Sequence, residues 1–185
     1  MSVSKHVRSF ARQENGAAAI EMAFIFPLMI LLFFGLIDAT ALISDFRRVS
    51  HAALVVGDDL IRLESPTTPA NVTDSFAAAE IMMRAALATD ARVEVYNYRR
   101  AGTLAVLRWD LDNGVGQPCG APNPQNLGNL MTAGNDVLVT VVCVRHTPIM
   151  TTLLGERILG STEFSLREQI AMRPRAGNFL ECPDC

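Results

Sequence analysis

Residues 16–38 read GAAAIEMAFIFPLMILLFFGLID, and this stretch decides the architecture of the chain. From Ala17 to Ile37 it holds 21 residues, with Glu21 as the single charge. About 20 helical residues cross a hydrocarbon core of roughly 30 Å. The stretch is therefore long enough to be a membrane-spanning helix. Pro27 does not argue against this, because membrane helices tolerate proline. A buried core helix is the alternative interpretation.

The segment before the apolar run, residues 1–16, is short and basic: MSVSKHVRSFARQENG. A secretory signal peptide has its small-residue cleavage site after the apolar core, whereas here the small residue, Gly16, precedes the core. An uncleaved membrane anchor with a basic tail is a second possibility. Charge asymmetry supports it only weakly, because Arg47 and Arg48 follow the span almost as closely as the leader precedes it.

Beyond the apolar run the sequence becomes amphipathic, with charged residues such as Asp45 falling between the apolar ones. This spacing predicts that the helix continues to about Glu64, over a length of roughly 70 Å. We expect its apolar stripe to pack against the sheet of the same chain, with an intermolecular coiled coil as the second choice. The stripe recurs at alternating spacings of four and three residues: Leu42, Phe46, Val49, Ala53, Val56, Leu60 and Leu63.

The rest of the chain predicts a small mixed domain. Two prolines in SPTTPANVTD (65–74) end the long helix, and a second helix is expected from Ser75 to Thr89. Two helices followed by an antiparallel sheet of about four strands is an α+β pattern. The strands are expected over 93–98, 103–110, 137–143 and 164–172, with a long loop at 112–134 that is rich in Gly, Pro and Asn.

Four cysteines lie beyond the span, and four cysteines allow three pairings. One pairing would tie the long loop to the third strand and leave the terminal CPDC (182–185) to close on itself. CPDC is similar to thioredoxin-like redox motifs, but no helix follows it to lower a thiol pKa. A zinc site is disfavoured because the other two cysteines are isolated in sequence. We therefore favour structural disulfides in an oxidising compartment, with Cys119, Cys143, Cys182 and Cys185 as the candidates, and we predict that Cys119 and Cys143 are joined.

Catalysis has little support in this sequence, which carries no recognisable nucleophile, zinc-protease or phosphate-binding motif. The three histidines, His6, His51 and His146, are scattered along the chain. The net charge of −3 disfavours a nucleic-acid surface. We expect no enzymatic activity, no metal and no cofactor.

Two stretches of the sequence resemble a known family. Gly16, followed by Ala17-Ala18-Ala19-Ile20 and then Glu21, resembles the cleavage site of type IV prepilins. The longer stretch FARQENGAAAIEMAFIFPLMILLFFGLID is most similar to the TadE/TadG-like pseudopilins of tight-adherence (Flp, type IVc) pili. Far away, VVCVRHTPIMTTLLGERILGSTEFSLREQIAMRPR (141–175) resembles the closing strands of that family and the turn between them.

The resemblance implies a pilin-like fold and a role in a pilus system. It implies cleavage by a prepilin peptidase between Gly16 and Ala17, and a single-pass anchor in the bacterial inner membrane with the C-terminal domain in the periplasm. The expected partners are other pilins, inner-membrane pilus-assembly proteins and the lipid bilayer, with no nucleic acid. Met22 stands where major pilins usually carry tyrosine, and the domain is far longer than a major pilin. Met22 is a departure from the family pattern, whereas the length favours a minor pilin or an assembly component; entry into the extracellular pilus stays open.

Glu21 acquires a specific role in this interpretation. After cleavage Ala17 would carry a new α-ammonium group, one helical turn from Glu21. A lone carboxylate in lipid costs roughly 2.5–3.5 kcal/mol, so its presence indicates a partner: its own N-terminus or that of a neighbouring subunit. Alternatively, Glu21 lies at the membrane edge and reaches water. The competing function for the whole chain is an unprocessed single-pass protein with a periplasmic binding or thiol-redox domain.

The sequence thus predicts four parts. They are a leader (1–16), a transmembrane helix (17–41), a periplasmic extension of that helix (42–64) and an α+β domain (65–185).

Overall fold

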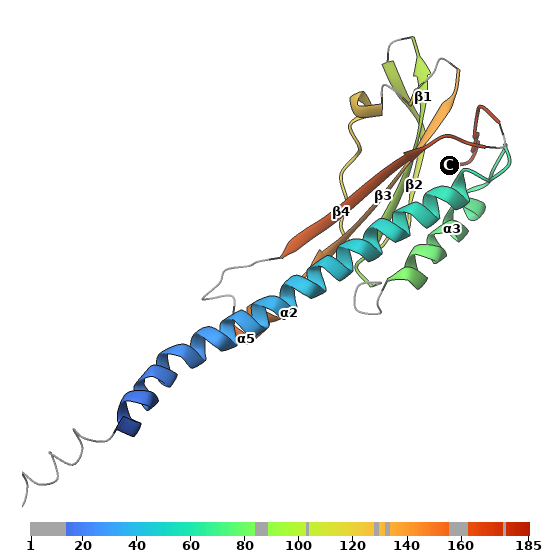
Figure 1. Ribbon diagram of the computed structural model, residues 1–185. Coiled ribbons are helices and arrows are strands. Elements are labelled where there is room, and N and C mark those ends of the chain that lie inside the picture. Colours follow the sequence, from blue (N-terminus) through green and yellow to red (C-terminus); the bar gives the residue numbers. More distant parts are fainter. Residues whose placement is uncertain are drawn as a thin grey trace, which may run out of the picture.

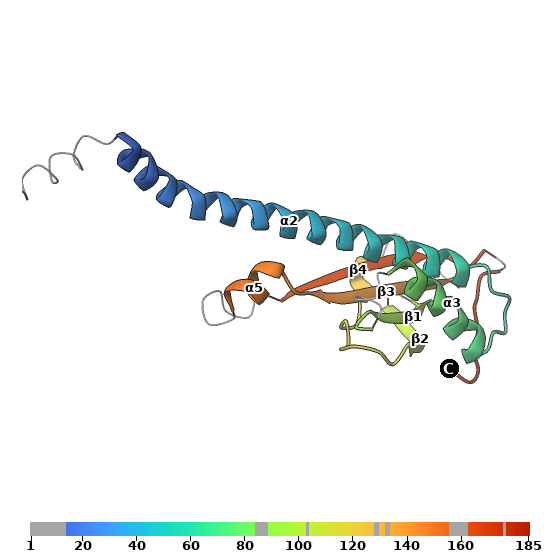
Figure 2. The same ribbon diagram turned by 90° about the horizontal axis from the view of Figure 1, so that it is seen from below.

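The computed structural model describes residues 14–83, 89–102, 104–127, 130–131, 134–155, 163–175 and 177–185. Its longest element is helix α2, Glu14–Leu60, which has 47 residues and continues through Pro27. At 1.5 Å per residue its length is about 70 Å. The N-terminal half of α2 projects away from the rest of the chain, and its C-terminal half lies along the sheet (Figures 1 and 2). The long helix predicted from the sequence is confirmed, and it ends four residues earlier than expected.

Four strands form one antiparallel sheet in the order β2-β1-β3-β4. The first two make a hairpin whose turn contains Gly102 at φ +64, a backbone conformation that favours glycine. The predicted α+β class and the number of strands are confirmed. The strands are β1 (Arg92–Ala101), β2 (Leu104–Asp112), β3 (Asp136–His146) and β4 (Phe164–Met172).

The second helix, α3, spans Pro69–Met82, so the predicted start at Ser75 is wrong by six residues. Thr68 is the N-cap, and its hydroxyl oxygen accepts a hydrogen bond from the Asn71 amide at 3.4 Å. Proline is favoured at the first helical position because the N–H it lacks has no partner there. Pro69 therefore begins α3 rather than merely separating two helices. Part of the predicted helix, residues 84–88, lies outside the described residues.

The packed half of α2 and helix α3 cover one face of the sheet (Figure 2). Val49, Ala53, Val56 and Leu60 of the predicted stripe are buried there, so the expectation that the stripe packs on the chain's own sheet is confirmed. Phe46 is an exception, because its side chain is 46% exposed. The sheet contributes Val93, Val95, Leu138, Val142 and Val144 to this core.

The opposite face of the sheet is covered by the segment that follows β2. Leu127, from the short 3-10 helix η1 (Pro124–Leu127), and Met131 are buried against this face. Strand β3 is consequently buried on both faces, which explains why apolar residues run almost without interruption through DVLVTVVCVRH. The strand residues in this second core are Tyr98, Val137, Val139 and Val141.

Candidate functional site

The N-terminal half of α2, defined here as the free half (residues 18–37), is exposed over most of its length, with Phe34 and Ile37 half-buried near its end. Its large apolar side chains are exposed all around the helix; Phe24, for example, is 78% exposed and Leu36 is 67% exposed. The 18-residue window with mean hydropathy 2.5 is 0% buried. Among the described residues, α2 is the one helix long and apolar enough to cross a membrane. Such a surface is unfavourable in water, so the free half is suited to serve as a single membrane anchor.

The residues expected at the cleavage site lie at the beginning of this half. Gly16 and Ala17 fall within the bounds of α2, and Glu21 follows one turn later with an exposed side chain. Glu21 forms no hydrogen bond or ion pair within the part of the chain that the structure describes. A partner for its carboxylate therefore lies outside these residues: a new N-terminus, a neighbouring molecule or water are the candidates.

The free half ends where Asp38 is bound to the domain. The Asp38 carboxylate accepts hydrogen bonds from the Ile149 amide at 2.8 Å and the Met150 amide at 3.0 Å. These are the first amides of the short helix α5 (Ile149–Leu154), whose own N-cap residue, Pro148, provides no side-chain cap. A carboxylate at a helix N-terminus is favourable because the backbone N–H groups there lack partners. Asp38 thereby caps α5 from a position 111 residues away in sequence.

A second polar contact lies two turns further along α2. Asp45 is fully buried, and its Oδ2 lies 2.8 Å from Nδ1 of His146 at the end of β3. The sequence pattern had assigned Asp45 to the polar side of the helix, and this assignment is wrong. The signal that could have located it is the seven-residue spacing between Asp38 and Asp45, which puts both carboxylates on one face of α2. The face that packs on the domain therefore begins with two acids and continues through Val49 and Val56.

The C-terminal segment is held at the far end of the sheet by Asp136. The buried Asp136 carboxylate accepts hydrogen bonds from Arg99 Nε at 2.6 Å, Asn97 Nδ2 at 3.1 Å and the Leu180 amide at 2.9 Å. The Leu180 carbonyl accepts from Asn97 at 2.8 Å and from the Trp109 indole at 2.9 Å. Burial would raise the pKa of Asp136, but the hydrogen bonds that it accepts, led by those from Arg99, outweigh burial and hold that pKa below its ordinary value.

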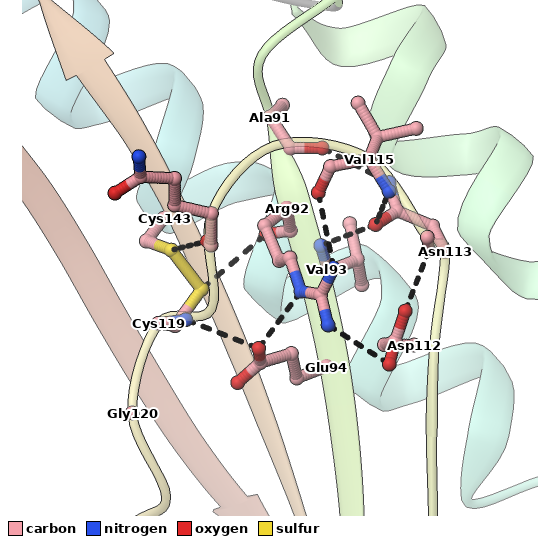
Figure 3. A network of polar contacts seen from close by, with 12 residues as sticks. Ala91, Arg92, Val93, Glu94, Asp112, Asn113, Val115, Cys119, Gly120 and Cys143 are labelled. Atoms are coloured by element: carbon pink, nitrogen blue, oxygen red, sulfur yellow. Dashed lines mark hydrogen bonds and ion pairs between the residues drawn. A yellow bond between two sulfur atoms is a disulfide. The ribbon is translucent and has the colours of Figure 1, made fainter.

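The four cysteines are arranged as two disulfides, Cys119–Cys143 and Cys182–Cys185. Figure 3 shows the first of them beside a polar network at the start of β1. Arg92 Nε lies 2.9 Å from Glu94 Oε1, and the same oxygen accepts from the Cys119 amide at 3.0 Å. This network and the sulfur bridge both fasten the loop after β2 to the sheet. Across the described segments, no group of three or more His, Cys, Asp or Glu side chains is placed to hold a metal ion.

Comparison with known proteins finds a matching family for the N-terminal part of the chain. Residues 16–56 match the model of the family described as TadE-like protein. The N-terminal region is TadE-like. The match begins at Gly16, covers the free half and ends in the packed half of α2, so the resemblance seen in the sequence is confirmed over this region. It does not reach residues 141–175, where the second resemblance stays a prediction. No curated protein and no solved structure matches the chain significantly.

Proposed function

We propose that this chain is a minor pilin, or pseudopilin, or a pilus-assembly protein of a tight-adherence type IV pilus system. One observation carries the proposal: the TadE-like region is a helix whose first half leaves the domain with apolar side chains exposed on every side. The TadE-like match associates the chain with the tight-adherence pilus system. Its role is structural, built on anchoring and association rather than on catalysis.

The proposed topology is a single pass through the bacterial inner membrane with the domain in the periplasm. The basic leader, residues 1–16, stays on the cytoplasmic side, residues 17–41 span the bilayer, and residues 42–64 and 65–185 lie outside it. Two features support this orientation. The leader carries Lys5, Arg8 and Arg12, and every cysteine lies on the domain side, where an oxidising compartment permits disulfides.

Processing is the part of the proposal that can be tested most directly. A prepilin peptidase would cut between Gly16 and Ala17, and the family match begins at Gly16. N-terminal sequencing of the membrane-extracted protein, from cells with and without the peptidase, should give Ala17 only when the enzyme is present. An intact Met1 or Ser2 in cells that contain the peptidase would overturn the proposal and favour an unprocessed anchor with a binding or redox domain.

A variant pair sharpens this test. Gly16→Ala should insert normally but be processed poorly, because the peptidase must bring its catalytic groups against this peptide bond. Gly35→Ala is the matched control: it lies in the same apolar run, and a Cβ added there meets no atom within 4 Å. Equal processing of both variants would contradict the assigned cleavage site.

The proposed assembly residue is Glu21. Glu21→Gln keeps the scissile bond and the leader, so cleavage should be unchanged and membrane insertion slightly improved. Co-purification with other pilins should nevertheless fall, because a buried ammonium on a neighbour would lose its counter-charge. Glu80→Gln, at an exposed position on α3, is the control. Undiminished co-purification and normal piliation of Glu21→Gln would remove the assembly role and leave the cleavage site in place.

A further inference from the structure

A basic groove opens on α2 just beyond the free half. It has a volume of about 430 Å³. Its α2 residues recur every three or four positions, so they share one face of the helix, on the side away from Asp38 and Asp45. The lining residues are Thr40, Ile43, Ser44, Arg47, Arg48 and His51 of α2, with Met82 at the end of α3.

The described lining of the groove holds two arginines and a histidine and no carboxylate. Arg47 is exposed and forms no hydrogen bond or ion pair with any described residue. Arg48 donates one hydrogen bond, from NH1 to the Met82 carbonyl at 3.4 Å. Its Nε is buried, and no acceptor for it lies among the described residues. Arg47 therefore offers the groove cationic donors that lack an acceptor among the described residues.

The length of α2 places these donors at a definite depth. If residues 17–37 fill the hydrocarbon core, the headgroup region occupies roughly the next 5–8 Å. The Cα atom of Arg47 lies about 14 Å beyond that of Asp38 along the helix axis. Helical side chains lean toward the helix N-terminus, and arginine is long enough to reach back toward the bilayer. The Arg47 guanidinium can consequently reach the outer part of the headgroup region, where the lipid phosphates lie, and Arg48 follows directly behind it.

Arginines at this position call for a specific explanation. Cations that follow a span on the translocated side oppose the charge asymmetry that orients membrane proteins. This reasoning rests on the topology in the proposed function. Arg47 and Arg48 also lie beside apolar groups, Ile43 and Met82, which a free inorganic anion would not use.

We propose that this groove binds the phosphate of an anionic phospholipid from the leaflet on the domain side. Arg47 and Arg48 supply the charge, and His51 lines the end of the groove farther from the bilayer. The glycerol region lies at Ile43, which is 54% exposed, and the acyl chains run from there along the free half. The ligand thus fixes how deep the chain lies in the membrane and how it is rotated about the axis of α2.

The experiment uses the full chain in membranes of phosphatidylethanolamine with a minor fraction of phosphatidylglycerol. After mild detergent extraction, native mass spectrometry counts the phosphatidylglycerol molecules that stay bound. The wild type should retain this lipid selectively, and the Arg47→Gln/Arg48→Gln variant should lose retention on the order of tenfold. Arg47→Lys/Arg48→Lys should keep most of it, because the charges remain. This second variant keeps the test decisive if the glutamine pair folds poorly.

The matched control is Arg62→Gln/Arg108→Gln, which removes the same charge at exposed positions of the domain. Retention in this control should equal that of the wild type. Equal retention in the groove variant, or loss of the lipid when inorganic phosphate is added, would overturn the assignment. Alkaline extraction and N-terminal sequencing separate the two proposals. A chain that inserts and is cut but shows no lipid selectivity refutes only the groove, whereas a chain that fails to insert refutes the proposed function.

Discussion

The two halves of helix α2 are continuous in structure but differ in what surrounds them. Along the free half, residues 18–37, the side chains before Phe34 are all exposed, and Phe34 and Ile37 are half-buried. Along the packed half, defined as residues 45–60, one side is buried against the sheet, and the other carries charged residues together with the exposed Phe46 and Leu54. The change occurs at Asp38 and Asp45, where α2 is first bound to the domain.

This contrast shows that one continuous helix can be suited to two environments, a folded domain along its packed half and an apolar surrounding along its free half. The packed half is stabilised by tertiary burial, as most protein helices are. The free half gains nothing comparable from its own chain, so a bilayer or other apolar partners have to cover it. The stability of the domain should therefore depend on the packed half and be indifferent to the free half.

The largest expected effect comes from placing a charge in the packed half. Val56 is fully buried between α2 and the sheet, so Val56→Asp would bury a carboxylate without a partner. We expect a loss of more than about 4 kcal/mol in the free energy of unfolding, enough to unfold most small domains. Urea denaturation of the detergent-solubilised chain, followed by tryptophan fluorescence of Trp109, measures this change.

Two matched substitutions test whether the free half and the packed half of α2 contribute independently to the stability of the domain. Leu54→Asp lies two residues away on the exposed side and should change domain stability by about 0.5 kcal/mol or less. Leu32→Asp, in the free half, should leave the domain equally stable and weaken membrane insertion by about 3 kcal/mol. If Leu32→Asp destabilised the domain as much as Val56→Asp does, the two halves of α2 would not be independent.

The next effect concerns Asp136, at the opposite end of the sheet from the free half. Asp136→Asn removes the counter-charge of the half-buried Arg99 and should cost about 3 kcal/mol. The pKa of Asp136 is lowered in the folded chain, so its contribution is present above the ordinary carboxyl pKa and is lost as the pH falls through the folded value. Wild-type stability should consequently fall between pH ~5 and pH ~2.

Urea titrations across this pH range provide the measurement for Asp136. The Asp136→Asn variant should lack this part of the stability loss at low pH. Asp110→Asn, at an exposed position of β2, should still show it. Parallel acid profiles for the wild type and Asp136→Asn would mean that Asp136 does not supply the pH dependence.

Effects of similar or smaller size are expected at the two disulfides. Replacing both Cys119 and Cys143 by alanine opens a link with a sequence separation of 24 and should cost about 3 kcal/mol. The corresponding change at Cys182 and Cys185, separated by 3, should cost about 2 kcal/mol because the closed loop is shorter. Mass mapping of the membrane-extracted protein under non-reducing conditions checks the pairing. Free thiols at 119 and 143 would contradict it.

Much of this architecture could be predicted because it follows from patterns that are local in the chain. The apolar run with Glu21 predicted the anchor-like helix, and the spacing from Val49 to Leu60 predicted the packed stripe. Alternation and turn residues predicted the four strands. The start of α3 was missed because Pro69 can either end a helix or begin one, and the outcome depends on the Thr68 cap.

The junction between the two halves was harder to predict because its contacts are distant in sequence. Asp45 looks like an ordinary polar residue until β3 brings His146 to within 2.8 Å of it. The same holds for Asp38, whose partners are backbone amides that no sequence pattern marks. The loop at 112–134 was predicted only as a connection, because irregular segments give no periodic signal for the face that they cover.

The smallest predicted effect probes this junction. Asp38→Asn keeps an acceptor oxygen for one amide of α5 but loses the charge and the second acceptor. The expected cost is about 1 kcal/mol, typical of a helix cap, and it should be confined to α5. Hydrogen exchange at the Ile149 and Met150 amides should quicken about fivefold, since 1.4 kcal/mol corresponds to a factor of ten. Global unfolding should not change, and Asp74→Asn, at an exposed position of α3, should alter neither quantity. Unchanged exchange at both amides would mean that α5 is held by its apolar contacts alone. The boundary of the free half would then lie at Asp45 rather than at Asp38.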